Sequence, residues 1–197
     1  VGNVGSIENI LKKIGCDVQV SSEISVLREA EKLILPGVGS FDYGMKNLNK
    51  FGLIDLLKEK VINLGTPLLG ICLGMQLLTE GSEEGSLPGL GFFKAYTKKF
   101  PSQCYGQKLN IPHMGWNYVQ TKEGVQLFNN SPANMRFYFV HSYYVECENE
   151  MDSIATTEYG LKFTSAIGRG RIFGVQFHPE KSHKYGMHLL KNFAELV

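Results

Sequence analysis

The sequence predicts an α/β fold: a mostly parallel central sheet flanked by helices, with additional antiparallel strands. Strand and helix signals alternate through the first half of the chain, which is typical of a parallel sheet covered on both faces. The second half, from Gly89 to Val145, is rich in turns and aromatic residues, which favours antiparallel hairpins. The 197 residues, 43% of them hydrophobic, suffice for a sizeable core, so we expect residues 1–197 to form a single domain.

Apolar stripes and helix-ending residues indicate the helices. A short helix is expected from Ser6 to Ile14, with Ser6 as its N-terminal cap and Gly15 ending it. Residues 47–64 are expected to be largely helical, with an inward-facing stripe made of Leu53, Leu56, Leu57, Val61 and Leu64. A final helix is expected from Tyr185 to Leu196.

Short apolar runs bounded by turn residues indicate the strands. In the first half we expect strands at residues 17–20, at residues 32–35 before Pro36-Gly37, and at residues 68–71. Near the end of the chain, residues 172–177 have the same character. No linker, repeat or low-complexity tract interrupts the pattern.

Composition excludes several classes of protein. The net charge of +1 gives no reason to expect nucleic acid or an anionic membrane surface as a partner, and the apolar runs are too short to span a bilayer. The cysteines are Cys16, Cys72, Cys104 and Cys147, and their spacing suits neither a zinc site nor a Cys-x-x-Cys pair. We therefore expect no metal, reduced and mostly buried thiols apart from Cys72, and a cytoplasmic protein.

The segment Gly70-Ile71-Cys72-Leu73-Gly74 is the most informative stretch of the chain. An apolar run leads into it and a helix-forming run follows it, which is the pattern of a nucleophile elbow. Glycines two residues before and after Cys72 allow a tight turn without Cβ clashes. This pattern predicts that Cys72 is a catalytic nucleophile.

The predicted strand at residues 172–177 is followed by His178-Pro179-Glu180. A cysteine nucleophile needs a base, and the base needs a third group to hold its tautomer. In an extended segment Glu180 faces the same way as His178. Alone the tripeptide is weak evidence, because a strand can simply end in a polar loop, but together with the elbow it predicts a Cys-His-Glu triad.

These two blocks resemble the signatures of the class I (triad) glutamine amidotransferases, and the resemblance covers nearly the whole chain. Three further blocks are most similar to the glutaminase subunits that supply a histidine-pathway cyclase: residues 35–41, 112–117 and 141–144. The resemblance implies no cofactor. Chains of this family begin with a strand before the Gly2-Asn3 loop, so we expect that one strand, roughly 5–6 residues, is missing before Val1.

The resemblance implies that Cys72 attacks the side-chain amide of L-glutamine while His178 acts as acid and base, oriented by Glu180. The oxyanion would be held by the N–H of Leu73 and by that of Val38 or Gly39. The glycines on either side of Val38 would make a peptide flip easy, so this loop could switch when a partner binds. A plain turn after a strand is an equal alternative.

By the same resemblance, glutamine is contacted by four side chains: Gln76, Glu84, Ser142 and Tyr143. Gln76 lies about one helical turn from Cys72, which is the right reach for a substrate on the elbow. Glu83 is an alternative to Glu84 as the partner of the substrate ammonium. Ser142 and Tyr143 could instead be sheet residues without a ligand.

No acceptor-binding motif is visible in the chain, so the acceptor chemistry is expected on another chain. The resemblance implies a heterodimer with a (β/α)8 cyclase that makes imidazole glycerol phosphate. Residues matching its docking face are Asn3, Trp116, Tyr138 and Lys181, although Trp116 could also be a core aromatic. His113, His183 and His188 have no partner by spacing and are interpreted as surface or helix residues.

Other interpretations remain open. A paralogue could supply ammonia for amidino sugars of surface polysaccharides, and residues 181–187 look somewhat like those copies. A free-standing γ-glutamyl hydrolase would need no partner, and a catalytically inactive scaffold would not need the complete triad.

Overall fold

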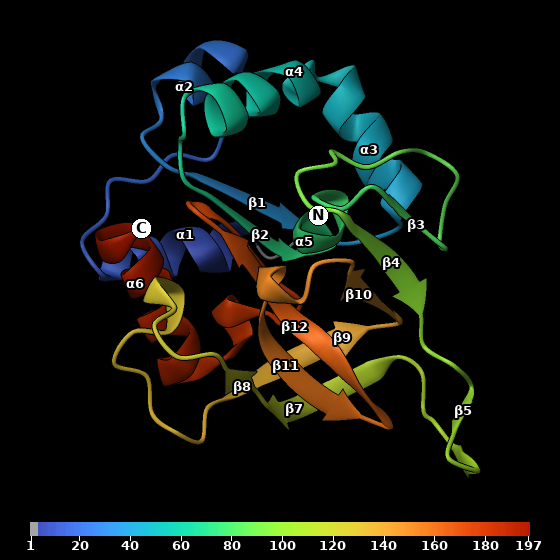
Figure 1. The fold of residues 1–197 in the computed structure, drawn as a ribbon. Helices are drawn as coiled ribbons and strands as arrows, with labels where there is room; N and C mark the ends of the chain where they lie inside the picture. Colours follow the sequence, from blue (N-terminus) through green and yellow to red (C-terminus); the bar gives the residue numbers. More distant parts are fainter. Residues whose placement is uncertain (1–3) are drawn as a thin grey trace.

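The computed structural model describes residues 4–197, and within them a nine-stranded sheet carries the fold (Figure 1). Its strand order is β1-β2-β13-β12-β10-β4-β3, and β11 joins β12 to the short strand β8. The strands of this sheet are β1 (Leu33–Gly37), β2 (Leu68–Cys72), β3 (Gly81–Ser82), β4 (Ala95–Lys99), β8 (Gln120–Thr121), β10 (Tyr143–Cys147), β11 (Ser153–Tyr159), β12 (Leu161–Arg169) and β13 (Ile172–Val175). The expected α/β class is confirmed.

The three strands at one end of the sheet run parallel. β2 lies between β1 and β13, with Gly37 opposite Cys72 and Val175 opposite Ile71. All five residues of β2 are buried, as expected for a strand covered on both faces. Cys72 therefore lies at the carboxyl end of a central parallel strand, where open α/β sheets place their sites.

Helices cover both faces of this parallel region, as Figure 1 shows. Leu69 and Ile71 of β2 pack into the apolar cluster that includes residues of α1 (Val4–Lys13) and α6 (His183–Leu196). Leu68 packs into the opposite cluster, with residues of α3 (Phe41–Lys50), α4 (Leu53–Leu57) and α5 (Leu73–Leu77). The alternation along β2 follows from the pleat, which sends successive side chains to opposite faces.

The antiparallel strands expected after Gly89 are present. β4 and β12 each pair antiparallel with β10, and two small antiparallel sheets lie beside the main one. One is β5 (Gln103–Cys104) with β6 (Gln107–Lys108), and the other is β7 (His113–Tyr118) with β9 (Arg136–His141). Short 3₁₀ turns connect these strands at Gln126–Phe128 and Glu150–Asp152.

Several local predictions are wrong. Residues 17–20 form no strand; they run between α1 and α2 (Ile24–Glu29), a helix that the sequence analysis missed, and Val20 is exposed. Ser6 does not cap α1, because this helix already includes Val4. Gly15 does end it, with a positive φ of 89°.

The expected helix over residues 47–64 is divided. α3 ends at Lys50, Gly52 takes a left-handed conformation with φ 65°, and α4 passes into a π-helical segment, Lys58–Asn63. The wider π turn shifts the helical phase, so Leu64 is 68% exposed while Val61 stays buried. Over the same described residues, no helix is long and apolar enough to cross a membrane.

Candidate active site

Cys72 adopts a strained backbone conformation at the junction of β2 and α5. Its φ of 55° and ψ of −112° lie outside the regions that non-glycine residues normally occupy. Such strain persists only where the surroundings enforce it, and it clusters at functional sites. The predicted elbow is therefore present, with Cys72 held at its apex.

The elbow glycines are required by close packing. A Cβ on Gly74 would lie 1.8 Å from the carbonyl oxygen of Leu35, and a Cβ on Gly70 would lie 2.7 Å from the backbone of Gly74. Real Cβ contacts are essentially never this short. The two glycines thus let the turn after Cys72 pack against β1.

His178 lies just beyond β13 and contacts Glu180. The imidazole Nδ1 is 2.9 Å from the carboxylate Oε1, and both side chains are almost fully buried. The 3₁₀ turn Pro179–Lys181 holds the pair. Burial lowers the pKa of His178, but interactions with the Cys72 thiol and with Glu180 outweigh it and raise the pKa to about 9.

The Nε2 atom of His178 remains available for chemistry. It is buried and makes no hydrogen bond to any group of residues 4–197. The Cys72 thiol lies near enough to raise the pKa of the imidazole. Loose contacts of this kind are common before substrate aligns the reacting groups.

Gln176, which no sequence motif singled out, lies beside Cys72. This fully buried amide donates from Nε2 to Sγ of Cys72 at 3.8 Å, and its Oε1 accepts from Nε2 of Gln76 at 3.0 Å. The signal for it was a lone polar residue between Val175 and Phe177, two positions before His178 and so on the same side of an extended chain.

The loop expected to complete the oxyanion site lies next to the elbow. Val38 and Gly39 directly follow Gly37, which is opposite Cys72 in the sheet register. The two glycines of the loop differ in role. Gly39 has a φ of 101°, whereas a Cβ on Gly37 would lie 2.9 Å from Cβ of Leu73. Gly39 therefore supplies the conformational freedom, and Gly37 lets the loop approach the first residue of α5.

The residues expected to bind glutamine lie around the same edge. Gln76 donates to the carbonyl oxygen of Tyr143 at 3.3 Å, which joins α5 to β10. Oε2 of Glu84 accepts the backbone N–H of Phe41 at 2.8 Å, at the start of the helix that follows the Val38-Gly39 loop. Burial raises the pKa of Tyr143, and the negative charge of Glu84 adds to this.

Glu83 and Glu84 hold different partners. Oε2 of Glu83 accepts the backbone N–H of Lys99, on β4, whereas Glu84 faces the loop that leads into α3. Ser142 is half-buried between β9 and β10, and its carbonyl accepts the N–H of Phe100. This arrangement favours Glu84 over Glu83 as the carboxylate nearer the site.

Three of the residues expected at a docking face lie together on one surface. Trp116 and Tyr138 are opposite each other on β7 and β9, and their rings meet edge to face with centroids 6.3 Å apart. Nζ of Lys181 lies 5.6 Å from the Tyr138 ring centroid. Trp116 is 42% exposed, so it is not a core residue. Asn3 lies outside the described residues.

His113 was expected at the surface or on a helix, and this prediction is wrong. It is buried on β7, only 3% exposed, and touches His141. His183 stacks on Trp116 and His188 lies on α6, as expected of surface or helix residues. The remaining thiols are unpaired in the described chain and half-buried.

Taken together, a strained cysteine, a buried imidazole with an open nitrogen and a carboxylate behind it define a thiol enzyme for acyl transfer. The family model for class-I glutamine amidotransferases matches residues 2–196. The chain belongs to this family.

Relatives and solved structures agree with this assignment. A Methanococcus maripaludis protein named imidazole glycerol phosphate synthase subunit HisH 2 is 57% identical over 195 residues, covering 99% of this chain and 95% of the relative. A Leptospira borgpetersenii protein named imidazole glycerol phosphate synthase subunit HisH is 46% identical over 196 residues, which cover 100% of this chain and 96% of the relative. Among solved structures, a GMP synthase protein from Thermoplasma acidophilum has a TM-score of 0.71 at 21% identity, covering 98% of this chain and 87% of its own, which shows a shared fold.

Proposed function

We propose that this chain hydrolyses L-glutamine to glutamate and ammonia and passes the ammonia to the (β/α)8 cyclase subunit of imidazole glycerol phosphate synthase, in histidine biosynthesis. The observation that carries the chemistry is the Cys72, His178 and Glu180 set with Nε2 of His178 open. The relatives named for this synthase, 57% and 46% identical over nearly the whole chain, support the choice of pathway. The unpaired thiols suit the reducing cytoplasm.

The residues take these roles in the proposed reaction. Sγ of Cys72 forms a bond to the side-chain amide carbon of glutamine, and the C–N bond breaks as His178 gives a proton to the departing nitrogen. Water then attacks the γ-glutamyl thioester, with His178 taking its proton, and glutamate leaves with the thiol restored. Glu180 holds the imidazole through Nδ1, which keeps Nε2 toward the reacting atoms.

Binding of the oxyanion and of the substrate is proposed around this centre. The N–H of Leu73 and that of Val38 or Gly39 would hold the oxyanion, since both segments lie beside Cys72. Gln76, Glu84, Ser142 and Tyr143 are proposed to bind glutamine. The carboxylate of Glu84 is the proposed partner of the substrate ammonium.

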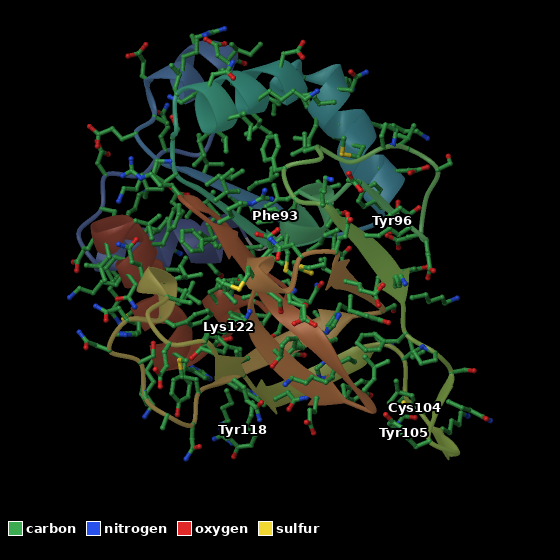
Figure 2. All side chains as sticks on the ribbon, viewed as in Figure 1. Phe93, Tyr96, Cys104, Tyr105, Tyr118 and Lys122 are labelled. Carbon is green, nitrogen blue, oxygen red and sulfur yellow. The ribbon has the colours of Figure 1, made fainter. Side chains whose placement is uncertain are left out.

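The cyclase is proposed to dock on the surface formed by Trp116, Tyr138 and Lys181, with Asn3 as a further contact. Tyr118 and Met114 extend this surface along β7, and both are more than half exposed. Tyr118 projects at the margin of the molecule in Figure 2. Exposed aromatic residues beside cations are typical of interface anchors.

The test is glutamine hydrolysis by this chain alone and then with a purified histidine-pathway cyclase and its nucleotide ligand. We expect strong activation by the cyclase with ligand. Trp116→Ala should weaken this activation, while Tyr96→Ala, an exposed tyrosine on β4, is the matched control and should leave it unchanged. The proposal would be overturned if the wild-type protein hydrolysed no glutamine either alone or together with the cyclase and its ligand.

A paralogous subunit for amidino-sugar synthesis is the second candidate. The relative from Methanococcus maripaludis carries the number 2 in its name, so numbered copies exist among proteins similar to this chain. For that function, glutamine hydrolysis would persist while the histidine-pathway cyclase gives no activation. Cys72 would then still be alkylated by a glutamine-mimicking electrophile.

A further inference from the structure

Two buried histidines touch each other beneath the proposed docking surface. His113 on β7 is opposite His141 on β9, and Nδ1 of His113 lies 2.9 Å from Nε2 of His141. Only 3% of His113 and 6% of His141 is exposed. Burial lowers the pKa of His113 to about 4 and that of His141 to about 3, so both rings are neutral at pH 7. Each ring therefore carries a single N–H.

The partners of the two rings determine where these protons lie. Nδ1 of His141 is 2.7 Å from the carbonyl oxygen of Tyr143, which can only accept, so His141 carries its proton on Nδ1. Nε2 of His141 is then an acceptor, and Nδ1 of His113 must donate to it. Nε2 of His113 is an acceptor in turn, and the Nδ2 group of Asn117 lies 3.2 Å away to fill it.

Asn117 fixes the start of this chain of hydrogen bonds. Its Oδ1 accepts the backbone N–H of Tyr118 at 2.8 Å, and its Nδ2 also donates to the carbonyl oxygen of Glu158 at 2.9 Å. These contacts define the orientation of the amide. All the hydrogen bonds therefore run in one direction, from Asn117 through His113 and His141 to Tyr143.

The far end of the chain reaches the proposed glutamine site. The carbonyl oxygen of Tyr143 also accepts from Nε2 of Gln76. The same Gln76 nitrogen donates to Gln176, which donates to the thiol of Cys72. The carbonyl oxygen of Tyr143 thus accepts two hydrogen bonds, one from Nδ1 of His141 and one from Nε2 of Gln76 on α5.

We propose that His113 and His141 are positioning residues for glutamine binding, which hold the Ser142-Tyr143 segment and the Gln76 amide in place through the Nδ1–H of His141. This inference rests on the proposed function, because it assigns the two histidines to the same glutamine site. His113 acts through His141: the Nδ1–H of His113 donates to Nε2 of His141 and so holds this ring with its own Nδ1–H toward the carbonyl of Tyr143.

The competing explanation is that the histidines only fill space. His113 is stacked between Phe139 and Tyr159, with ring centroids 4.8 Å and 4.0 Å away. Two variants separate these roles. His113→Phe keeps a stacked ring and removes the donor, whereas His113→Asn removes the ring and places an amide N–H near the position of Nδ1.

Kinetics of glutamine hydrolysis should follow the donor and not the ring. We expect His113→Phe to raise KM for glutamine by about tenfold with kcat nearly unchanged, as for loss of one hydrogen bond. His113→Asn should have a KM closer to wild type even though it is the less stable protein. If KM instead follows thermal stability, so that His113→Asn is worse than His113→Phe, the positioning role is wrong.

Histidine side-chain ¹⁵N NMR of the intact wild-type protein tests the tautomers directly. We expect two neutral rings at pH 7 protonated on Nδ1, which is the minor tautomer of free histidine. In His113→Phe, the Nε2 signal of His141 should change toward that of a nitrogen that accepts no hydrogen bond, while Nδ1 keeps the proton that it donates to the carbonyl of Tyr143. Observation of Nε2-protonated or charged rings in wild-type protein would overturn the inference.

The inference can fail separately from the proposed function. Wild-type protein that hydrolyses glutamine but shows the other tautomers would keep the function and refute the positioning role. Alkylation of Cys72 by iodoacetamide, which lacks the α-carboxylate and α-ammonium groups of glutamine, should proceed equally in wild type and in His113→Phe. A slower reaction in the variant would show damage to the nucleophile and would also refute the assignment.

Discussion

The backbone N–H of His178 donates to the carbonyl oxygen of Tyr138 at 2.9 Å. The strand that presents Tyr138 on the proposed docking surface therefore also holds the backbone of the proposed catalytic base. Ser182 closes this link, since its Oγ donates to the carbonyl of His178 at 2.6 Å and accepts the N–H of Tyr138 at 3.0 Å. Ser182 is fully buried, so no water replaces these bonds.

Replacement of Ser182 by alanine should affect both activity and stability. Ser182→Ala leaves the N–H of Tyr138 without the hydroxyl that accepts it and removes one of the two hydrogen bonds at the carbonyl of His178, which also accepts the N–H of Lys181; we expect a loss of about 1–3 kcal/mol of unfolding free energy. We expect kcat for glutamine to fall about tenfold, because His178 loses its backbone support. The control is Ser153→Ala, which also loses a hydroxyl hydrogen bond, to Thr164, but lies on β11. Equal kcat values for the two variants would contradict this role.

Replacement of Cys72 by alanine should separate hydrolysis from ammonia use. Cys72→Ala removes the nucleophile, so glutamine hydrolysis should fall by about 10⁴-fold or more. The complex with the cyclase should still accept ammonium salts at raised pH, measured as product formation from its nucleotide. Cys147→Ala is the matched control and should hydrolyse glutamine as wild type does. Burial raises the pKa of the Cys147 thiol to about 11, so this thiol is a poor nucleophile at pH 7. Hydrolysis retained in Cys72→Ala would refute the assignment.

The elbow should not accept a side chain at Gly74. Gly74→Ala places a Cβ against the backbone oxygen of Leu35, so we expect a loss of at least about 3 kcal/mol and of glutaminase activity. Gly5→Ala, in α1, meets nothing within 4 Å and should stabilise the protein by about 0.5–1 kcal/mol. Urea unfolding of both variants measures the contrast, and comparable stability would contradict the close packing.

Stability should fall as the pH rises above the ordinary histidine range. The pKa of His178 is raised from 6.5 to about 9, so folded protein keeps a proton that unfolded chains lose above pH 6.5. The stabilisation is fully present below pH 6.5 and is lost as the pH rises through 9, and it amounts to at most about 3 kcal/mol. Glu180→Gln should lower the pKa of His178 and move this loss to lower pH. Urea unfolding of both proteins from pH 6 to 10 measures the free energy of unfolding. The same pH dependence in Glu180→Gln as in wild type would contradict an ion pair between His178 and Glu180.

Stability should also fall toward acid pH, for the opposite reason. The pKa values of His113 and His141 are lowered to about 4 and about 3 by burial, so unfolded chains bind protons below pH 6.5 that the folded protein does not. The free energy of unfolding should therefore decrease as pH falls from 6.5 to 4, by up to about 1.4 kcal/mol per pH unit for each histidine. His113→Asn should reduce the slope by one such contribution. A slope unchanged in this variant would show that His113 is protonated when folded.

Prediction from the sequence succeeded where the information is local. The elbow around Cys72 needs its glycines within two residues, and the His178-Glu180 contact spans a single turn, so both are visible in short motifs. It failed where an element depends on distant contacts. Residues 17–20 have strand-like composition but no strand paired to them, and the π turn after α4 exposes Leu64 against its apolar character.

By itself, the sequence determined the fold class and the nature of the reaction, because backbone sterics and residue chemistry act within a few positions of Cys72 and His178. Only the tertiary structure decided that Gln176 lies against the thiol of Cys72, 104 residues away, and that His113 meets His141, 28 residues away. These contacts arise from the register of paired strands and from burial, which withholds water and forces each polar atom to find a partner. The positions of the hydrogen-bond donors around the nucleophile are therefore a property of the packed sheet.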